Sequence, residues 1–271
     1  MEIVNLWAHE RDKVQFIDLS NADLKGRDLS GLNLVEARLE GADLSGAKMK
    51  GANLTEADLT GVDLTGADLS RCDLTRARLV GFKSKGTDFS QSEGAEADLS
   101  DGEMFSGKIT GNWRGARLNG LSLTQTKSQG IDLCGASMSK GWFTNCDFSG
   151  GHFAGIIGDG SDFFSCEFEE ASFKGASLVG CDFSFARRHK ARFEFADLRE
   201  AQMDQRFGEI PWGWLEQHGS LVRHDAVVIE RAVRLGVDQD IVDMVLGDHP
   251  ELSPEAAVEV LTSYSRVPRA R

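Results

Sequence analysis

The chain has 271 residues, with 30 Lys or Arg against 43 Asp or Glu, so its formal net charge is −13. This acidic balance argues against direct nucleic-acid binding, which needs clustered basic side chains. No apolar run approaches the ~18 residues that cross a bilayer, and the first residues lack the apolar stretch of a signal peptide. We therefore expect a cytoplasmic protein that binds neither membranes nor nucleic acid directly.

A five-residue repeat begins at Ile17 and reads IDLSN-ADLKG-RDLSG-LNLVE-ARLEG-ADLSG without a gap. The central position is Leu or Phe, and a small residue, usually Ala, stands two positions before it. This period matches neither the 3.6-residue period of an α-helix nor the simple alternation of a strand. It favours a chain that turns a corner after every few residues, with one large and one small side chain pointing inward.

The central positions run from Leu19 to Ile109 at steps of five. One residue is then missing, and the series restarts at Trp113 and continues to Met203. We predict a kink or bulge near residues 110–112. The centres that are not apolar are Ser84, Gly94, Ser128, Gly158 and Arg188.

Phenylalanines recur at intervals of twenty, as at Phe143, Phe163 and Phe183 and again at Phe153, Phe173 and Phe193. Twenty residues contain four units, so we expect four units per coil and equivalent side chains stacked at ~4.8 Å. About 9.5 coils would form a tube filled by its own side chains. Such a tube has no pocket for a substrate, and we expect no enzyme activity and no cofactor.

These repeats resemble the pentapeptide-repeat family, whose motif is A(D/N)LxX. The resemblance implies an all-β solenoid, a right-handed quadrilateral β-helix, over residues 17–205. Residues 1–16 are then an N-terminal cap. The repeat stops near Gln205, and residues 206–271 are expected to form a small α-helical C-terminal segment.

No motif for catalysis or metal binding is present. The histidines have no H-E-x-x-H spacing, and no Walker loop or G-x-S-x-G occurs. Four cysteines occupy the small inward position, and only Cys134 is expected to face outward. These are Cys72, Cys146, Cys166 and Cys181. We expect buried free thiols and no metal site.

Two sets of outward residues are candidates for binding a partner. The acidic candidates are Asp58, Asp63, Asp68, Glu93, Glu96, Asp98, Asp101 and Glu103. An apolar stripe is expected along one side of the rod, made of Phe105, Trp142, Phe164 and Phe185. Either the C-terminal segment folds back over this stripe, or the stripe contacts another protein.

The C-terminal segment, residues 206–271, has apolar residues at helical spacing over 222–235, followed by Gly236. Ser253 and Pro254 are typical of a further helix start. Something must cover the open end of a β-helix, so this segment is expected to cap the rod or to form a homodimer.

Two functions are compatible with this sequence. Some members of the resembled family mimic duplex DNA and bind DNA gyrase or topoisomerase IV, so the resemblance implies an acidic rod that occupies a basic DNA site. The alternative is a structural scaffold or targeting module that uses the aromatic stripe and is unrelated to topoisomerases.

Overall fold

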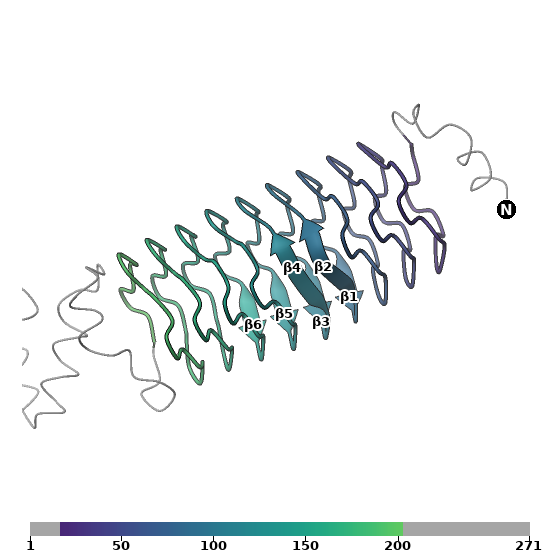
Figure 1. Ribbon diagram of the computed structural model, residues 1–271. Coiled ribbons are helices and arrows are strands. Elements are labelled where there is room, and N and C mark those ends of the chain that lie inside the picture. Colours follow the sequence, from purple (N-terminus) through teal and green to yellow (C-terminus); the bar gives the residue numbers. More distant parts are fainter. Residues whose placement is uncertain (1–16, 203–271) are drawn as a thin grey trace, which may run out of the picture.

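The computed structural model describes residues 17–202, which wind into an elongated rod of stacked coils (Figure 1). Parallel bridges join residues twenty positions apart, or nineteen across the missing residue, from Asp18 with Arg38 at one end to Asp182 with Gln202 at the other. Each coil adds a layer of ~4.8 Å, giving about nine coils. The all-β solenoid is therefore confirmed. The cap at 1–16 and the helical segment at 206–271 lie outside the described residues, and right-handed winding stays a prediction.

The bridges recur at four positions in each coil and form four columns along the rod. Column 1 begins at Asp18, column 2 at Asp23, column 3 at Asp28 and column 4 at Asn33. Because each column collects residues from every coil, side chains about twenty positions apart in sequence become neighbours on the surface.

The corners between columns follow from the last residues of each unit. At the first corner, the backbone N–H of Ala22 donates to the carbonyl of Leu19 at 3.0 Å. Asn21, between them, has a φ of 58°. A left-handed residue at the third turn position is typical of a type II turn, which explains why so many units end in Gly.

Six short strands lie in the middle of the rod, and they pair in parallel (Figure 1). One sheet has the order β1-β3-β5-β6, and the other pairs β2 with β4. Their bounds are β1 (Lys83–Lys85), β2 (Asp88–Glu93), β3 (Glu103–Phe105), β4 (Lys108–Asn112), β5 (Ser122–Thr124) and β6 (Trp142–Thr144). No helix that could cross a membrane is found within residues 17–202.

Stacked rings fill the core of the C-terminal half. The ring centroids of Phe143 and Phe163 are 5.1 Å apart, and those of Phe163 and Phe183 are 4.9 Å apart. Neighbouring stacks meet edge to face, as Phe143 does with Phe148 at 5.9 Å. This is the twenty-residue stacking that the sequence predicts, and it leaves the outer surface as the place where binding can occur.

The missing residue near 110–112 is absorbed by a bulge between β2 and β4. Phe89 pairs with Ile109, but Ser92 pairs with Gly111, so the two strands differ by one residue. Gly111 has a φ of 106°, which only glycine adopts easily. The predicted bulge is confirmed, and the columns continue beyond it with their faces unchanged.

Interruptions of the repeat are compensated by neighbouring side chains. At the Ser84 centre, the ring of Phe82 is fully buried and fills the core, and a Cβ on Gly102 in the next coil would overlap it. At the Gly158 centre, the larger Ile156 takes the small position. Arg188 is buried, and its guanidinium donates to the Phe183 carbonyl at 3.2 Å.

Candidate functional site

The eight acidic candidates are spread around the rod. Column 1 contains two of them, column 2 two, column 3 one and column 4 one, while Glu96 and Asp101 lie at corners. In column order these six are Asp58, Asp98, Asp63, Glu103, Asp68 and Glu93. The structure therefore does not collect them into one acidic face.

Column 1 alternates acid and base from coil to coil. The order along it is Asp18, Arg38, Asp58, Arg78, Asp98 and Arg117. Ion pairs join Arg38 to Asp18 at 3.4 Å, Arg78 to Asp58 at 3.8 Å and Arg117 to Asp98 at 3.6 Å. The negative charge of Asp58 and Asp98 is thus locally balanced, and this column is a poor imitation of a phosphate backbone.

Column 2 carries the longest acidic run of the N-terminal half. Asp23, Asp43 and Asp63 stand on consecutive coils, and within residues 17–202 none of them forms an ion pair. Hydrogen bonds from Ser45, together with attraction to Lys25, lower the pKa of Asp43 below its ordinary value. The carboxylate of Asp43 is therefore charged at neutral pH.

Asp23 and Asp43 were not among the sequence candidates. The signal that could have found them is the net charge of each column summed over a few neighbouring coils. The sum over a whole column also includes Lys83, which follows Asp63, and so does not reveal the local acidic run.

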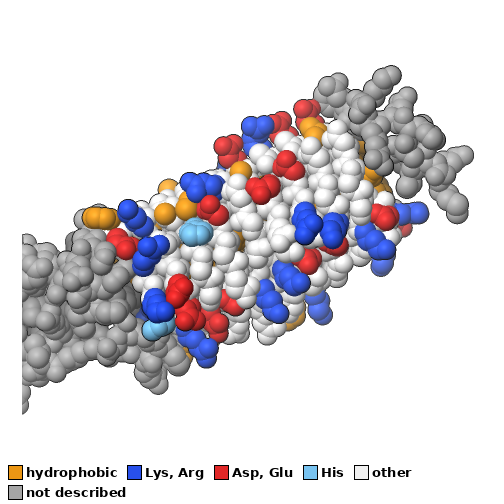
Figure 2. All heavy atoms as spheres, viewed as in Figure 1, with side chains coloured by type: hydrophobic (Ala, Val, Ile, Leu, Met, Phe, Trp, Pro, Cys, Tyr) orange, Lys and Arg blue, Asp and Glu red, His pale blue; other side chains and the backbone are white. Residues whose placement is uncertain are grey.

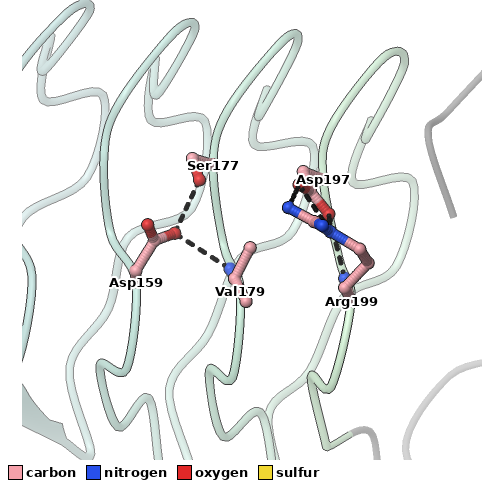
Figure 3. A network of polar contacts seen from close by, with 5 residues as sticks. All are labelled: Asp159, Ser177, Val179, Asp197 and Arg199. Atoms are coloured by element: carbon pink, nitrogen blue, oxygen red, sulfur yellow. Dashed lines mark hydrogen bonds and ion pairs between the residues drawn. The ribbon is translucent and has the colours of Figure 1, made fainter.

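Many of the repeated aspartates also stabilise their own turn. Asp197 accepts the backbone N–H of Arg199 two residues later, at 3.2 Å, and binds its guanidinium as well (Figure 3). Where Ser177 replaces this aspartate in the previous coil, Asp159 reaches across and accepts from the hydroxyl of Ser177 at 2.6 Å and from the N–H of Val179 at 3.0 Å (Figure 3). These carboxylates have a structural role, which reduces the number available for a partner.

The aromatic stripe is exposed as predicted, with 60% of Trp142 accessible, 40% of Phe164 and 39% of Phe185. Trp142 begins β6 on column 2. Phe164 and Phe185 meet edge to face at 5.2 Å. We call Trp142, Phe164 and Phe185 the aromatic patch.

Phe105 stands apart from this patch. It is exposed at the end of β3, where the ammonium of Lys85 lies 5.8 Å from its ring centroid. In register with it, Thr124 and Thr144 occupy the two coils before Phe164. The single stripe expected from the sequence is thus divided.

Two further exposed hydrophobic side chains lie outside column 2, and the sequence reading missed both. They are Ile157, on column 1, and Phe195, at the corner before column 1. Counting positions within the five-residue repeat also identifies these two residues as outward-facing, once all four columns are examined.

Two aromatic residues are held in an unfavourable backbone conformation. Phe185 has a φ of 60° and Phe195 a φ of 59°. The left-handed region costs a bulky residue ~1–2 kcal/mol relative to the right-handed one. Glycine occupies the equivalent corner in several other coils, and polar residues such as Glu96 and Ser165 occupy it in others, so the left-handed corner is a general feature of the rod and the bulk of the two rings is what distinguishes these positions.

The inward cysteines are free thiols that bond to backbone carbonyls. Cys166 Sγ lies 3.1 Å from the Phe143 carbonyl, and Cys72 Sγ lies 3.0 Å from the Met49 carbonyl. Ser161 makes the same kind of bond to Met138. Burial raises the pKa of Cys72 and of Cys181 to about 12, so these two thiols are unreactive. Among residues 17–202, no group of three or more His, Cys, Asp or Glu could hold a metal ion.

Comparison with protein families gives matches along the chain. The model described as pentapeptide repeats, eight copies, matches residues 17–55, 52–83, 114–150 and 166–205, together more than half of the sequence. The unmatched stretches contain the Ser84 and Gly94 centres, the bulge and the Gly158 centre. No curated protein sequence matches significantly.

Solved structures of several repeat proteins align with the rod. HetL from the cyanobacterium Nostoc, involved in heterocyst differentiation regulation, is 24% identical with a TM-score of 0.42, over 73% of this chain and 96% of HetL. The plasmid-mediated fluoroquinolone resistance protein QnrB1 is 21% identical with a TM-score of 0.41, over 62% and 87%. A protein from the Arabidopsis thaliana thylakoid lumen is 26% identical with a TM-score of 0.23, over 49% and 66%.

Proposed function

Because this chain belongs to the pentapeptide-repeat family, we propose that it is a non-catalytic cytoplasmic rod that binds a protein partner on its outer surface. The filled core supports this proposal, since rings such as Phe163, Phe168 and Phe173 are fully buried and occupy the interior. A reaction would need a concave site, whereas a rod offers columns of side chains to a flat or grooved partner.

The observation that carries the proposal is the aromatic patch on column 2. Aromatic side chains are enriched at the centres of protein interfaces, where their burial supplies most of the binding energy. Asp162 supports the patch by accepting the N–H of Phe164 at 2.8 Å. Phe185 places a ring at a left-handed corner, where the preceding coils carry the smaller or polar Asn145 and Ser165.

A capture experiment tests this proposal. The double variant Trp142→Ala/Phe164→Ala removes the exposed rings without touching the core, and Ile157→Ala is the matched control because Ile157 is equally exposed on column 1. We expect proteins retained from the source cytosol by the wild type and the control to be lost with the double variant. Identical retention by all three proteins would refute the role of the patch.

The second candidate partner is DNA gyrase or topoisomerase IV, bound by imitation of DNA. The observation that favours it is the unpaired run of Asp23, Asp43 and Asp63 on consecutive coils of column 2, in a chain of net charge −13. Elsewhere acid and base are interspersed, as the visible face of the rod shows (Figure 2). Mimicry would therefore use the N-terminal half of column 2 rather than the whole rod.

A supercoiling assay with and without a quinolone tests this second candidate. We expect the wild type to change gyrase activity and the triple variant Asp23→Asn/Asp43→Asn/Asp63→Asn to lose the effect, because asparagine keeps the turn acceptor and removes the charge. The effect should weaken steeply with salt. The absence of any effect at micromolar protein in low salt would exclude this candidate.

A further inference from the structure

We infer that the aromatic patch and the two carboxylates beside it, Asp162 and Asp182, bind an arginine side chain on an extended segment of the protein partner. The inference rests on the proposed function, since it specifies what the partner brings to the patch. Trp142, Asp162 and Asp182 stand on consecutive coils of column 2. Phe164 follows Asp162 by two positions, and Phe185 follows Asp182 by three. Exposed rings therefore border two carboxylates over about 10 Å of the rod.

Both carboxylates keep an oxygen for a partner. Oδ1 of Asp162 accepts the backbone N–H of Phe164 at 2.8 Å, and Oδ1 of Asp182 accepts that of Ser184 at 2.7 Å. Within residues 17–202, neither aspartate forms an ion pair. Both residues are half-buried. Since partly buried charges are screened less by salt than exposed ones, a cation placed here would gain more than at an open surface.

Elsewhere on the rod, the chain supplies such cations itself. On column 3, Arg187 pairs with Glu167 at 3.2 Å. Between β1 and β3, the ammonium of Lys85 lies 5.8 Å from the ring centroid of Phe105. At the patch, Lys140 occupies the corner before Trp142, but within residues 17–202 it forms no ion pair with either aspartate. The patch thus has the rings and the carboxylates of a cation site, and the cation is what a partner can add.

The geometry favours a guanidinium over an ammonium. Neighbouring coils are ~4.8 Å apart, so a planar group with several donors in one plane can reach the Oδ2 atoms of both Asp162 and Asp182. The flat face of the same group can stack on the exposed indole of Trp142. An ammonium is a compact point charge that does not combine these contacts as well. The ligand that uses every part of this surface is therefore arginine.

The flanking rings predict the residues around this arginine. In an extended segment, side chains two positions apart point to the same face. Apolar residues two positions before and two positions after the arginine would lie about 13 Å apart, enough to contact Trp142 on one side and Phe185 on the other. The partner segment is therefore expected to have the pattern apolar-x-Arg-x-apolar.

Binding of a short peptide to the full-length protein tests the inference. The probe is a fluorescein-labelled peptide, Leu-Ser-Arg-Ser-Leu with blocked ends. Its matched forms carry either lysine or citrulline, a neutral group of similar shape, in place of the arginine. By fluorescence anisotropy, we expect binding to weaken about tenfold or more with citrulline and about threefold or more with lysine. A lysine or citrulline peptide that binds as tightly as the arginine peptide overturns the inference.

Variants of the rod locate the binding. Asp162→Asn/Asp182→Asn keeps the turn acceptors and should weaken the arginine peptide about tenfold or more, with wild-type circular dichroism. The matched control is Asp68→Asn/Asp88→Asn, which removes two turn carboxylates from consecutive coils of column 3, where no exposed ring stands. This control should bind like the wild type. Equal weakening in both variants would mean that only net charge matters and would overturn the inference.

Trp142→Ala gives an independent readout if the aspartate variant fails to fold, because it removes an exposed ring and no turn contact. We expect it to weaken the arginine peptide about threefold or more. Unchanged binding would show that the ring takes no part, contrary to the inference.

Sedimentation of the same proteins identifies a second copy of the chain as the occupant. If the wild type dimerises and Asp162→Asn/Asp182→Asn is a monomer, the patch is covered by another copy and the inference is wrong. Sedimentation that is the same for both proteins supports a partner of a different kind.

Failure of the proposed function would look different. If the arginine peptide binds as expected and yet the wild type retains no protein from the cytosol through the patch, arginine recognition stands and the partner-binding role is wrong. If proteins are retained through Trp142 and Phe164 but Asp162→Asn/Asp182→Asn retains them equally well, the partner-binding role stands and arginine recognition is wrong.

Discussion

The indole ring of Trp113 occupies the space that a side chain at Gly94 would need. A Cβ built on Gly94 would overlap the ring, and Trp113 is fully buried, with its centroid 6.1 Å from that of Phe89. Gly94 stands at a central position where the repeat ordinarily places Leu. The interruption in the pattern and the large residue after the missing position are therefore two parts of one packing arrangement.

Restoring the repeat at this point should destabilise the protein. Gly94→Leu is expected to lower the free energy of unfolding by about 1–3 kcal/mol, because the added side chain overpacks the core against Trp113. The double variant Gly94→Leu/Trp113→Leu should recover part of the loss. Urea unfolding followed by circular dichroism measures both, and a Gly94→Leu variant as stable as the wild type would contradict the packing described.

The pair formed by Phe82 and Gly102 gives a second core prediction. Gly102→Ala should destabilise the rod, because the new methyl group overlaps the Phe82 ring. In Phe82→Ala/Gly102→Ala the second change should cost much less, so the two substitutions should couple by roughly 0.5–3 kcal/mol in a double-mutant cycle. Strictly additive losses would show that the ring moves aside freely.

At the exposed corner residue Phe195 we predict a substitution that stabilises the protein. Phe195→Gly should raise the urea midpoint. The free energy of unfolding should increase by about 1 kcal/mol, because glycine adopts a φ of 59° without the strain that a bulky side chain suffers there. Gly175→Ala, at the equivalent corner of the preceding coil with a φ of 67°, is the control and should lower it. A lower midpoint for Phe195→Gly would mean that the ring contributes more to stability than its exposure suggests.

The cysteines should differ in reactivity towards a thiol reagent. Cys134 is partly exposed, whereas Cys72 and Cys181 are buried, and burial raises the pKa of each of these two thiols to about 12. We expect Cys134 to be alkylated first in the native protein at about pH 8, with the other two protected until urea unfolds the rod. Mass spectrometry of digested samples gives the order, and early labelling of Cys72 would contradict it.

Acid should unfold the rod. Hydrogen bonds from Ser20 and Ser45 lower the pKa values of Asp18 and Asp43 below their ordinary 3.8, and other aspartates of the columns shift in the same direction. A lowered folded-state pKa means that the unfolded chain binds more protons, so this contribution is present above pH 3.8 and is lost as the pH falls through the folded-state values.

The measurement is the urea midpoint from neutral pH to about pH 2.5. It should stay nearly constant down to the ordinary aspartate value and then fall. Asp43→Asn keeps the acceptor for Ser45 and should be less sensitive to acid than the wild type. A midpoint that rises in acid would mean that repulsion among carboxylates, as along column 2, outweighs their hydrogen bonds.

Most of the scaffold could be predicted from the order of residues. The five-residue spacing assigned inward and outward positions, and the phenylalanine interval set the twenty-residue coil that the Phe143 and Phe163 stack confirms. The missing residue after Ile109 placed the bulge. These features are local or periodic, and a stacked repeat has few ways to bury such a pattern.

The surface was only partly predictable. The exposure of Trp142 and Phe164 followed from their position in the repeat. The separation of Phe105 from them, and the pairing of Asp58 with Arg78, depend on which residues stand one coil away.

By itself, therefore, the sequence determined the solenoid, its period and which side chains face outward, because burial of a periodic apolar pattern depends only on spacing along the chain. The tertiary structure decided which carboxylates form an ion pair with a neighbour, which exposed rings are in contact, and that the Trp113 ring occupies the space left by the absent side chain of Gly94. Those outcomes depend on distances of a few ångströms between residues about twenty positions apart, and small differences in register and side-chain volume set such distances.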